Sequence, residues 1–106
     1  FMEPGWTPLL PTPPFPDYPS GHSTSSGTCA YLLTKLLGQV SFTDTTHLRM
    51  GMAPRHFDSF DATAEESSNS RVYGGIHYRN AIENGVAMGK MIGAEIFNRV
   101  KLKRIQ

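Results

Sequence analysis

Two short motifs contain the residues of this chain that could act chemically on an anion. The first is Pro19–His22, which reads Pro-Ser-Gly-His, and the second is Ser70–His77, which reads Ser-Arg followed by five residues and a histidine. Between them they supply hydroxyls, a guanidinium and two imidazoles, a set of groups suited to a tetrahedral oxyanion. The rest of the chain is expected to be the scaffold that holds these two segments together.

The first motif stands where a helix is expected to begin. A helix that starts at Ser20 directs the free N–H groups of its first turn outward, with about half a positive charge at that end. Such an end binds anions, the Ser20 hydroxyl can donate to an anion oxygen, and Gly21 lets the backbone approach closely. His22 lies in the first turn, where it can exchange a proton near neutral pH. An ordinary capped turn with an exposed histidine is the alternative, and this motif alone does not separate the two.

The second motif adds a cation and another imidazole. Arg71 offers a rigid fork of donors that matches a tetrahedral oxyanion. His77 follows six residues later, across Gly74 and Gly75, and can reach the same centre from another direction. A neutral imidazole there can be a nucleophile toward phosphorus or an axial ligand to a metal oxyanion. One histidine would then bond the central atom while the other moves protons.

With both motifs in this order, the chain resembles the superfamily of type 2 phosphatidic acid phosphatases and vanadium-dependent haloperoxidases. The longer string over residues 13–24 is more similar to the haloperoxidase branch. The resemblance implies an all-α helical bundle that oxidises halide with hydrogen peroxide at a histidine-bound vanadate. The site residues that it implies are the axial vanadate ligand His77, the acid–base group His22, and the oxyanion-binding residues Ser20, Gly21 and Arg71.

Two other functions stay open at this point. The resemblance also covers an acid-phosphatase-type phosphomonoesterase or lipid phosphatase, which would bind phosphate as substrate and use His77 as its nucleophile. A non-catalytic relative that keeps only the helical scaffold is the third possibility. Peroxide and halide, or a phosphoester, are therefore the expected small-molecule partners. The resemblance further implies an extracytoplasmic location, periplasmic or secreted.

The basic part of the family's site is missing from this sequence. The family carries a lysine and an arginine upstream of Pro-Ser-Gly-His, whereas the first basic residue here is Lys35. These charges either come from an upstream segment of a longer protein, come from a second chain, or are absent altogether. Without them, this chain alone should bind vanadate or phosphate poorly, because charge-assisted hydrogen bonds are the strong ones. The expected enzyme is therefore the parent protein.

A second family residue is also missing, on the other side of the site. Many relatives have an aspartate four residues after the second histidine, where this chain has Ala81. His77 then needs another partner to fix its tautomer. The candidates are a backbone carbonyl, Asn80, Glu65 and Glu66.

The elements that must position these residues are mostly helices. Residues 1–19 hold seven of the eight prolines, which excludes a helix or a central strand and predicts an extended strap. A polyproline ligand is the alternative for this segment, since residues 11–14 fit PxxP. Residues 20–106 are expected to form a helical partial domain. Its predicted helices cover residues 20–37, 58–68 and 78–100, and its weakly patterned residues 39–56 predict a hairpin or an irregular loop.

Local signals fix the ends of these helices and suggest how they pack. Ser20 and Asp58 are the expected N-caps, and Gly38 stands where the first helix should stop. Gly85, Gly89 and Gly93 recur every four residues in the last helix. We expect them to let another helix backbone approach closely, which offsets a propensity cost of about 1 kcal/mol each.

Composition narrows the possible functions. A net charge of +1 over 106 residues is too small to indicate nucleic acid or an anionic membrane surface as partner. No apolar run is long enough for a membrane span. The single cysteine, Cys29, excludes an internal disulfide framework and a four-cysteine zinc site. The chain begins at Phe1, so we expect a processed or trimmed piece of a longer protein.

Overall fold

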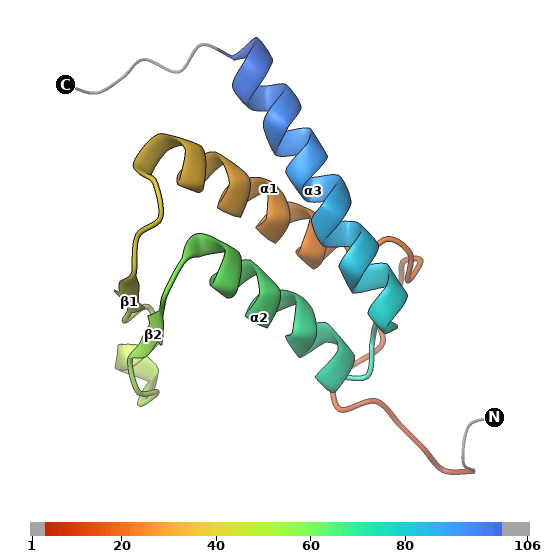
Figure 1. Ribbon diagram of the computed structural model, residues 1–106. Helices are drawn as coiled ribbons and strands as arrows, with labels where there is room; N and C mark the ends of the chain where they lie inside the picture. The colour runs from red at the N-terminus through yellow and green to blue at the C-terminus, as the bar shows by residue number, and fades with distance from the viewer. Residues whose placement is uncertain (1–3, 101–106) are drawn as a thin grey trace.

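The computed structural model describes residues 4–100, which fold mainly into helices (Figure 1). The helices are α1 (Gly21–Leu37), α2 (Phe60–Tyr73) and α3 (Arg79–Arg99). A short antiparallel pair of strands, β1 (Phe42–Asp44) and β2 (Arg55–Phe57), lies between α1 and α2 in the chain, with the 3₁₀ helix η1 (Leu48–Met50) between the two strands. The predicted all-α class is confirmed, because the only sheet among the described residues consists of two strands of three residues. None of the described helices is long and apolar enough to cross a bilayer.

Helix α1 begins and ends where the sequence predicts. Ser20 has extended backbone angles, and its side-chain oxygen accepts the N–H of Ser23 at 3.3 Å, which makes it the N-cap. At the other end Gly38 adopts a φ of +80°, and its N–H donates to the carbonyl of Thr34 at 2.8 Å. The first predicted helix is therefore confirmed at both ends.

Helices α1 and α3 lie against each other (Figure 1), and the close approaches at their glycines bring the two backbones into contact. A Cβ added at Gly89 would lie 2.2 Å from the carbonyl oxygen of Thr24, and one added at Gly27 would lie 2.7 Å from that of Val86. The hydroxyl of Thr28 lies 2.9 Å from the carbonyl oxygens of both Thr24 and Gly89, so it bridges the two helices. The expected role of the glycine ladder is confirmed. We call this contact the α1–α3 seam.

Helix α2 differs from the prediction at both ends. Ser59, not Asp58, is the N-cap, because the Ser59 hydroxyl accepts the N–H of Ala62 at 3.0 Å. The predicted end lay near Ser68, and the asparagine and serine that follow it are poor helix formers. The helix continues to Tyr73 all the same, and the hydroxyl of Ser70 donates back to the carbonyl of Ser67 at 2.6 Å. Arg71 therefore lies in the last turn of a helix rather than in a loop.

This cap assignment makes a prediction about stability. Replacing Ser59 by alanine should lower the free energy of unfolding by about 1 kcal/mol, because the N–H of Ala62 loses its acceptor. Replacing the exposed Asp58 by alanine is the matched control and should stay within about 0.5 kcal/mol of the unchanged protein. Urea unfolding measures both variants. A larger loss for the Asp58 variant would show that the cap is assigned wrongly.

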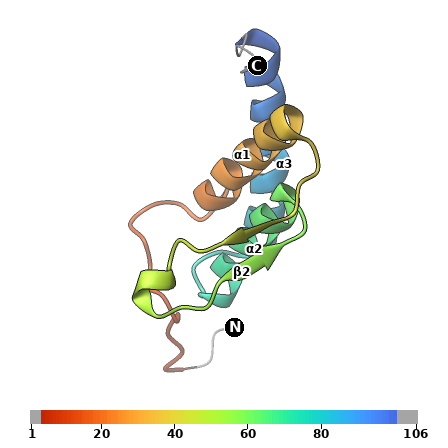
Figure 2. The same cartoon turned by 90° about the vertical axis from the view of Figure 1, so that its left-hand side faces the viewer.

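The hairpin covers the start of α2, as the turned view in Figure 2 shows. Phe42 on β1 pairs with Phe57 on β2, and their ring centroids lie 5.5 Å apart. The ring of Phe42 also stacks on Phe60 in the first turn of α2, at 5.4 Å. Of the two structures predicted for residues 39–56, the hairpin is the one that forms.

The proline-rich segment is tied to the turn between α2 and α3. The N–H of Leu10 donates to the carbonyl of Gly74 at 3.0 Å, and the Leu10 side chain covers Gly74. Gly75 has a φ of +77°, and an added Cβ there would lie 3.1 Å from Pro8. The division of the chain into a strap over residues 1–19 and a partial domain over residues 20–106 stays a prediction. Residues 1–3 and 101–106 lie outside the described residues.

Candidate functional site

His77 is the most enclosed of the predicted site residues that carry an imidazole. Its side chain is 1% exposed, and its Nδ1 lies 2.8 Å from a carboxylate oxygen of Asp17 and 2.9 Å from the Asp17 backbone carbonyl oxygen. Its Nε2 is buried and has no hydrogen-bond partner among the described residues. Both Asp17 oxygens can only accept, because neither a carboxylate nor a carbonyl carries a proton. The proton of the neutral ring is therefore assigned to Nδ1, and Nε2 keeps its lone pair.

The partner of His77 corrects part of the sequence-based expectation. A backbone carbonyl was among the candidates, and the carbonyl of Asp17 takes that place. Asn80 bonds instead to Asn84, and Glu66 forms an ion pair with Arg55 of β2. Sequence reasoning missed the carboxylate of Asp17. The signal was there, because Asp17 is the one acidic residue in the string over residues 13–24 that carries the first motif.

The position that holds an aspartate in many relatives is closed in this fold. Ala81 is 1% exposed, and its carbonyl accepts the N–H of Ser20 at 3.1 Å. This bond joins the start of α1 to the first turn of α3. A longer, charged side chain at position 81 would be buried against the start of α1, where its desolvation would be costly. The carboxylate that contacts His77 comes instead from the strap.

The first motif has the geometry of a capped helix start. Ser20 is fully buried, its N–H is taken by Ala81, and its hydroxyl oxygen caps α1. Gly21 and His22 follow in the first turn, where backbone N–H groups have no carbonyl one turn back to bond. A Cβ added at Gly21 would meet no atom within 4 Å, so open space lies in front of this turn. An anion could approach these N–H groups through that space.

His22 is exposed, and its pKa depends on the charges of Arg71 and His77. Partial burial lowers the pKa of His22 most, and the nearby positive charges of Arg71 and of a protonated His77 lower it further. These interactions place the three side chains in one neighbourhood. With its pKa below the ordinary value of 6.5, His22 is mostly neutral at pH 7. It can therefore accept a proton there.

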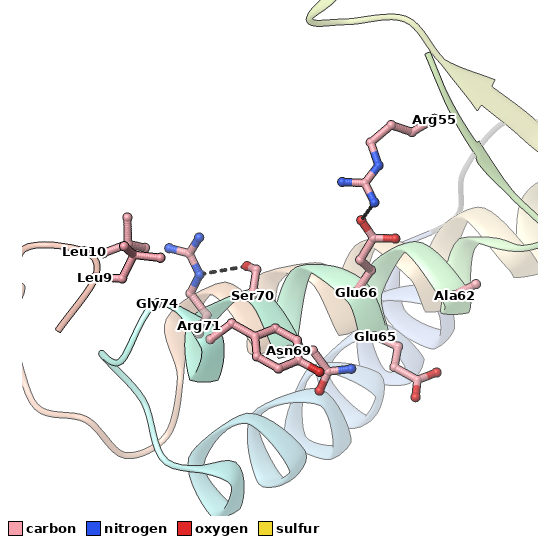
Figure 3. Close-up of a pocket in the computed structure, with 11 residues that line it drawn as sticks. Leu9, Leu10, Arg55, Ala62, Glu65, Glu66, Asn69, Ser70, Arg71 and Gly74 are labelled. Carbon is pink, nitrogen blue, oxygen red and sulfur yellow. Dashed lines mark hydrogen bonds and ion pairs between the residues drawn. The ribbon is translucent and has the colours of Figure 1, made fainter. Parts of the chain in front are cut away.

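Arg71 extends beside the strap at the end of α2 (Figure 3). Its Nε donates to the hydroxyl of Ser70 at 3.2 Å, and its guanidinium lies next to Leu10 in a cleft of about 660 Å³. Glu66 pairs with Arg55, and Glu65 points away from Arg71 (Figure 3). No carboxylate forms an ion pair with Arg71 within residues 4–100. Its N–H donors remain available to an anion.

His77 borders a second cleft, which Asp17 also lines. This cleft has a volume of about 740 Å³ and is bordered by Trp6 and Arg79 as well as by His77 and Asp17. The ring of Phe15 lies 6.4 Å from that of His77, between centroids. Arg71 and His77 thus line different clefts, and both act electrostatically on His22.

These residues fit part of a site for a vanadate or phosphate ion. A buried imidazole nitrogen with a free lone pair, an unpaired guanidinium and an open helix start are the groups that such an ion needs. The lysine and arginine of the family pattern have no counterpart before Lys35. The described residues therefore include an imidazole and a guanidinium that could take part in such a site.

The comparisons with known proteins agree in relating this chain to vanadium-dependent haloperoxidases. The family described as the VCPO second helical-bundle domain matches residues 1–104. Among solved structures, the chain is similar to the first bacterial vanadium-dependent iodoperoxidase, with 47% identity, a TM-score of 0.85, and coverage of 91% of this chain and 24% of that one. A holo-type bacterial vanadium-dependent chloroperoxidase shares the fold, with 19% identity, a TM-score of 0.66, and coverage of 85% and 22%. No curated protein matches.

The coverage shows how much of a related protein this chain represents. The chain spans about a quarter of the length of the solved structures that it matches. The apo-type chloroperoxidase gives the same picture, with a TM-score of 0.65 and 22% of its length covered. The family match and the similarity to these solved structures confirm the predicted relation to the haloperoxidase branch.

Proposed function

The chain belongs to the family of the VCPO second helical-bundle domain, and from that premise we propose that it forms part of a vanadate-dependent haloperoxidase, which oxidises halide with hydrogen peroxide. One observation supports this proposal more than any other. His77 is buried, its Nδ1 is bonded to Asp17, and its Nε2 has no partner among the described residues. An unpaired buried nitrogen is costly, so its persistence favours a ligand at that atom.

His77 would hold the ion through Nε2. Because its Nδ1–H donates to Asp17, Nε2 keeps its lone pair, and that atom has no hydrogen-bond partner among the described residues. Vanadate bound there would supply a Lewis-acid centre that activates peroxide toward halide. Arg71 and the N–H groups at Gly21 would hold the charged oxygens, and Ser20 would contribute its hydroxyl proton. The missing lysine and arginine would come from another segment of the protein or from a second chain.

His22 would move the proton. It lies in the first turn of α1, is exposed, and is mostly neutral at pH 7 because its pKa is lowered. A neutral imidazole can take a proton from peroxide and return one to a departing oxygen. The extracytoplasmic location is part of this proposal and is supported by the resemblance alone.

A phosphatase is the second candidate, and the same histidine favours it. An imidazole whose Nδ1–H is held by a carboxylate is also a good nucleophile toward phosphorus. The contact between Asp17 and His77 therefore supports both chemistries. The solved structures to which this chain is similar are haloperoxidases, which favours the first.

Assays of the protein that contains this chain separate these functions. With vanadate, peroxide and either iodide or bromide, a haloperoxidase should halogenate a phenol-type acceptor and lose this activity when vanadate is removed. A phosphatase would instead hydrolyse p-nitrophenyl phosphate and be inhibited by vanadate. The absence of both activities, with no vanadate binding, would indicate a non-catalytic scaffold.

The effect of Arg71 on His22 gives a prediction that needs no bound ion. Replacing Arg71 by glutamine removes a positive charge that disfavours protonation of His22, so the pKa of His22 should rise. Proton NMR of the His22 ring during a pH titration measures this shift. Replacing Arg55 by glutamine is the matched control, because Arg55 pairs with Glu66 and should leave His22 unchanged.

The same shift sets the sign of the pH dependence. The neutral form of His22 is lost as the pH falls through its lowered pKa, so activity should decline on the acid side of that value. In the Arg71 variant the decline should begin at higher pH. Equal titration of His22 in the unchanged protein and the Arg71→Gln variant would contradict the proximity of these two residues.

A further inference from the structure

Asp17 contacts the histidine side of the site through two of its oxygens. Its carboxylate Oδ1 lies 2.8 Å from Nδ1 of His77, and its backbone carbonyl oxygen lies 2.9 Å from the same atom. The same Oδ1 also accepts the backbone N–H of Tyr78, at 3.3 Å. Tyr78 is the N-cap of α3, and its side chain forms no capping bond. Asp17 thus fixes both the ring of His77 and the backbone that enters α3.

These contacts determine which ring nitrogen can act. Since both oxygens around Nδ1 are acceptors, the proton of the neutral ring belongs there. The bond to the carboxylate also limits rotation of the ring about its Cβ–Cγ bond. Nε2 therefore points in one direction, and it is the buried nitrogen that has no partner within residues 4–100.

We propose that Asp17 is a positioning residue, which keeps His77 in the Nδ1–H tautomer and aims Nε2 at a tetrahedral oxyanion. The identity of that ion rests on the proposed function, whereas the tautomer does not. Asp17 would do from the strap what an aspartate after the second histidine does in many relatives. The strap is then part of the site as well as a covering for the turn between α2 and α3.

The charge of Asp17 makes the proposal easy to distinguish from a simple electrostatic effect. A carboxylate beside an anion site repels the anion, so its removal would strengthen binding if charge alone mattered. Loss of a group that orients a ligand typically weakens binding by about 10- to 100-fold. The two effects have opposite signs, and the larger one decides the outcome.

The test measures orthovanadate affinity and the tautomer of His77 in the protein that contains this chain. Asp17→Ala should weaken vanadate binding by about 10- to 100-fold, measured by calorimetric titration. Nitrogen NMR of the histidine-labelled protein should show Nδ1–H alone in the unchanged protein and a rise in the Nε2–H tautomer in this variant, in which only the backbone carbonyl of residue 17 still accepts from Nδ1. Asp17→Asn should keep the tautomer and most of the affinity, because an amide oxygen can still accept from Nδ1.

Glu83→Ala is the matched control. Glu83 is an exposed carboxylate of α3 without a bond to His77, and its removal should change neither the affinity nor the tautomer. If the Asp17→Ala variant does not fold, the Asp17→Ser variant, which also lacks the carboxylate, takes its place in both measurements. The proposal is overturned if the carboxylate-free variant binds vanadate as tightly as the unchanged protein, or more tightly, and keeps the Nδ1–H tautomer.

The two measurements also separate this inference from the proposed function. If the unchanged protein binds no vanadate, the proposed function fails, and the tautomer alone decides the role of Asp17. A mixed tautomer in Asp17→Ala would then support a positioning role toward another ligand. A single Nδ1–H tautomer in that variant would overturn it.

Discussion

Replacing His77 by alanine should abolish vanadate binding by the protein that contains this chain. The variant lacks the only nitrogen within residues 4–100 that is buried, has no hydrogen-bond partner and belongs to a ring oriented by a carboxylate. Arg71 and the start of α1 would remain and could still donate hydrogen bonds to the ion. Water also solvates the charged ion well, so these donors alone should not hold it. Halide oxidation should fall to the level without vanadate. Vanadium NMR and calorimetric titration measure the binding directly.

A second histidine provides the control for this experiment. His56 lies on the exposed hairpin, where it contacts Thr43 and Asp58. Replacing it by alanine removes an imidazole of the same kind and should leave vanadate binding intact. Circular dichroism establishes that both variants are folded. Binding by the His77 variant equal to that of the His56 variant would contradict the assignment of His77 as ligand, and with it the proposed function.

Replacing Gly89 by alanine should cause the largest loss of stability among the glycine-to-alanine substitutions in α3. The added Cβ would lie 2.2 Å from the carbonyl oxygen of Thr24 and 2.9 Å from the backbone nitrogen of Thr28. Both are backbone atoms, so no side chain can rotate away and the two helices must separate. Overpacking of this kind costs about 1–3 kcal/mol or more. Alanine regains up to about 1 kcal/mol of helix propensity, which does not offset a contact this close.

The seam allows a graded version of the same experiment. At Gly85 the closest atoms to an added Cβ are the Ser23 Cβ at 2.8 Å and the Ser20 carbonyl oxygen at 2.9 Å. At Gly93 the closest is the Tyr31 Cβ at 3.0 Å. The expected order of destabilisation by alanine is therefore Gly89, then Gly85, then Gly93. Met91→Ala, on the exposed face of the same helix, is the control and should change stability by about 0.5 kcal/mol or less. Urea unfolding that shows no such order would contradict the seam.

Local chemistry explains why much of the fold could be predicted from the sequence. Ser20 and Gly38 mark the two ends of α1, where a hydroxyl side chain caps the start and a glycine with positive φ ends the helix. Both signals are local, so they can be recognised in the sequence. The glycine ladder likewise predicted a close helix contact without naming its partner. Helix α2 was harder, because Ser59 and Asp58 are both good caps and adjacent in sequence. Its extension beyond Ser68 opposes the local propensity of its own residues.

The sequence predicted which residues form the candidate site better than it predicted which residues they contact. The two motifs named His22, Arg71 and His77, and the pKa of His22 responds to the other two. The contact between Asp17 and His77 joins residues 60 positions apart, so it depends on how the strap folds back. No periodicity or spacing encodes that path. The partner of Glu66, which was one of the candidates to contact His77, likewise comes from a distant segment, since Arg55 lies on the hairpin.

The α1–α3 seam also has a consequence for motion within the site. His22 lies in the first turn of α1, and His77 lies just before α3, whose first turn accepts the Ser20 N–H through Ala81. Contacts between backbones contain no rotamers that could absorb a displacement, unlike layers of long side chains. The two imidazoles should therefore keep their spacing as a ligand arrives and leaves. Such a framework is preorganised, and little of the binding energy is lost to rearranging the protein.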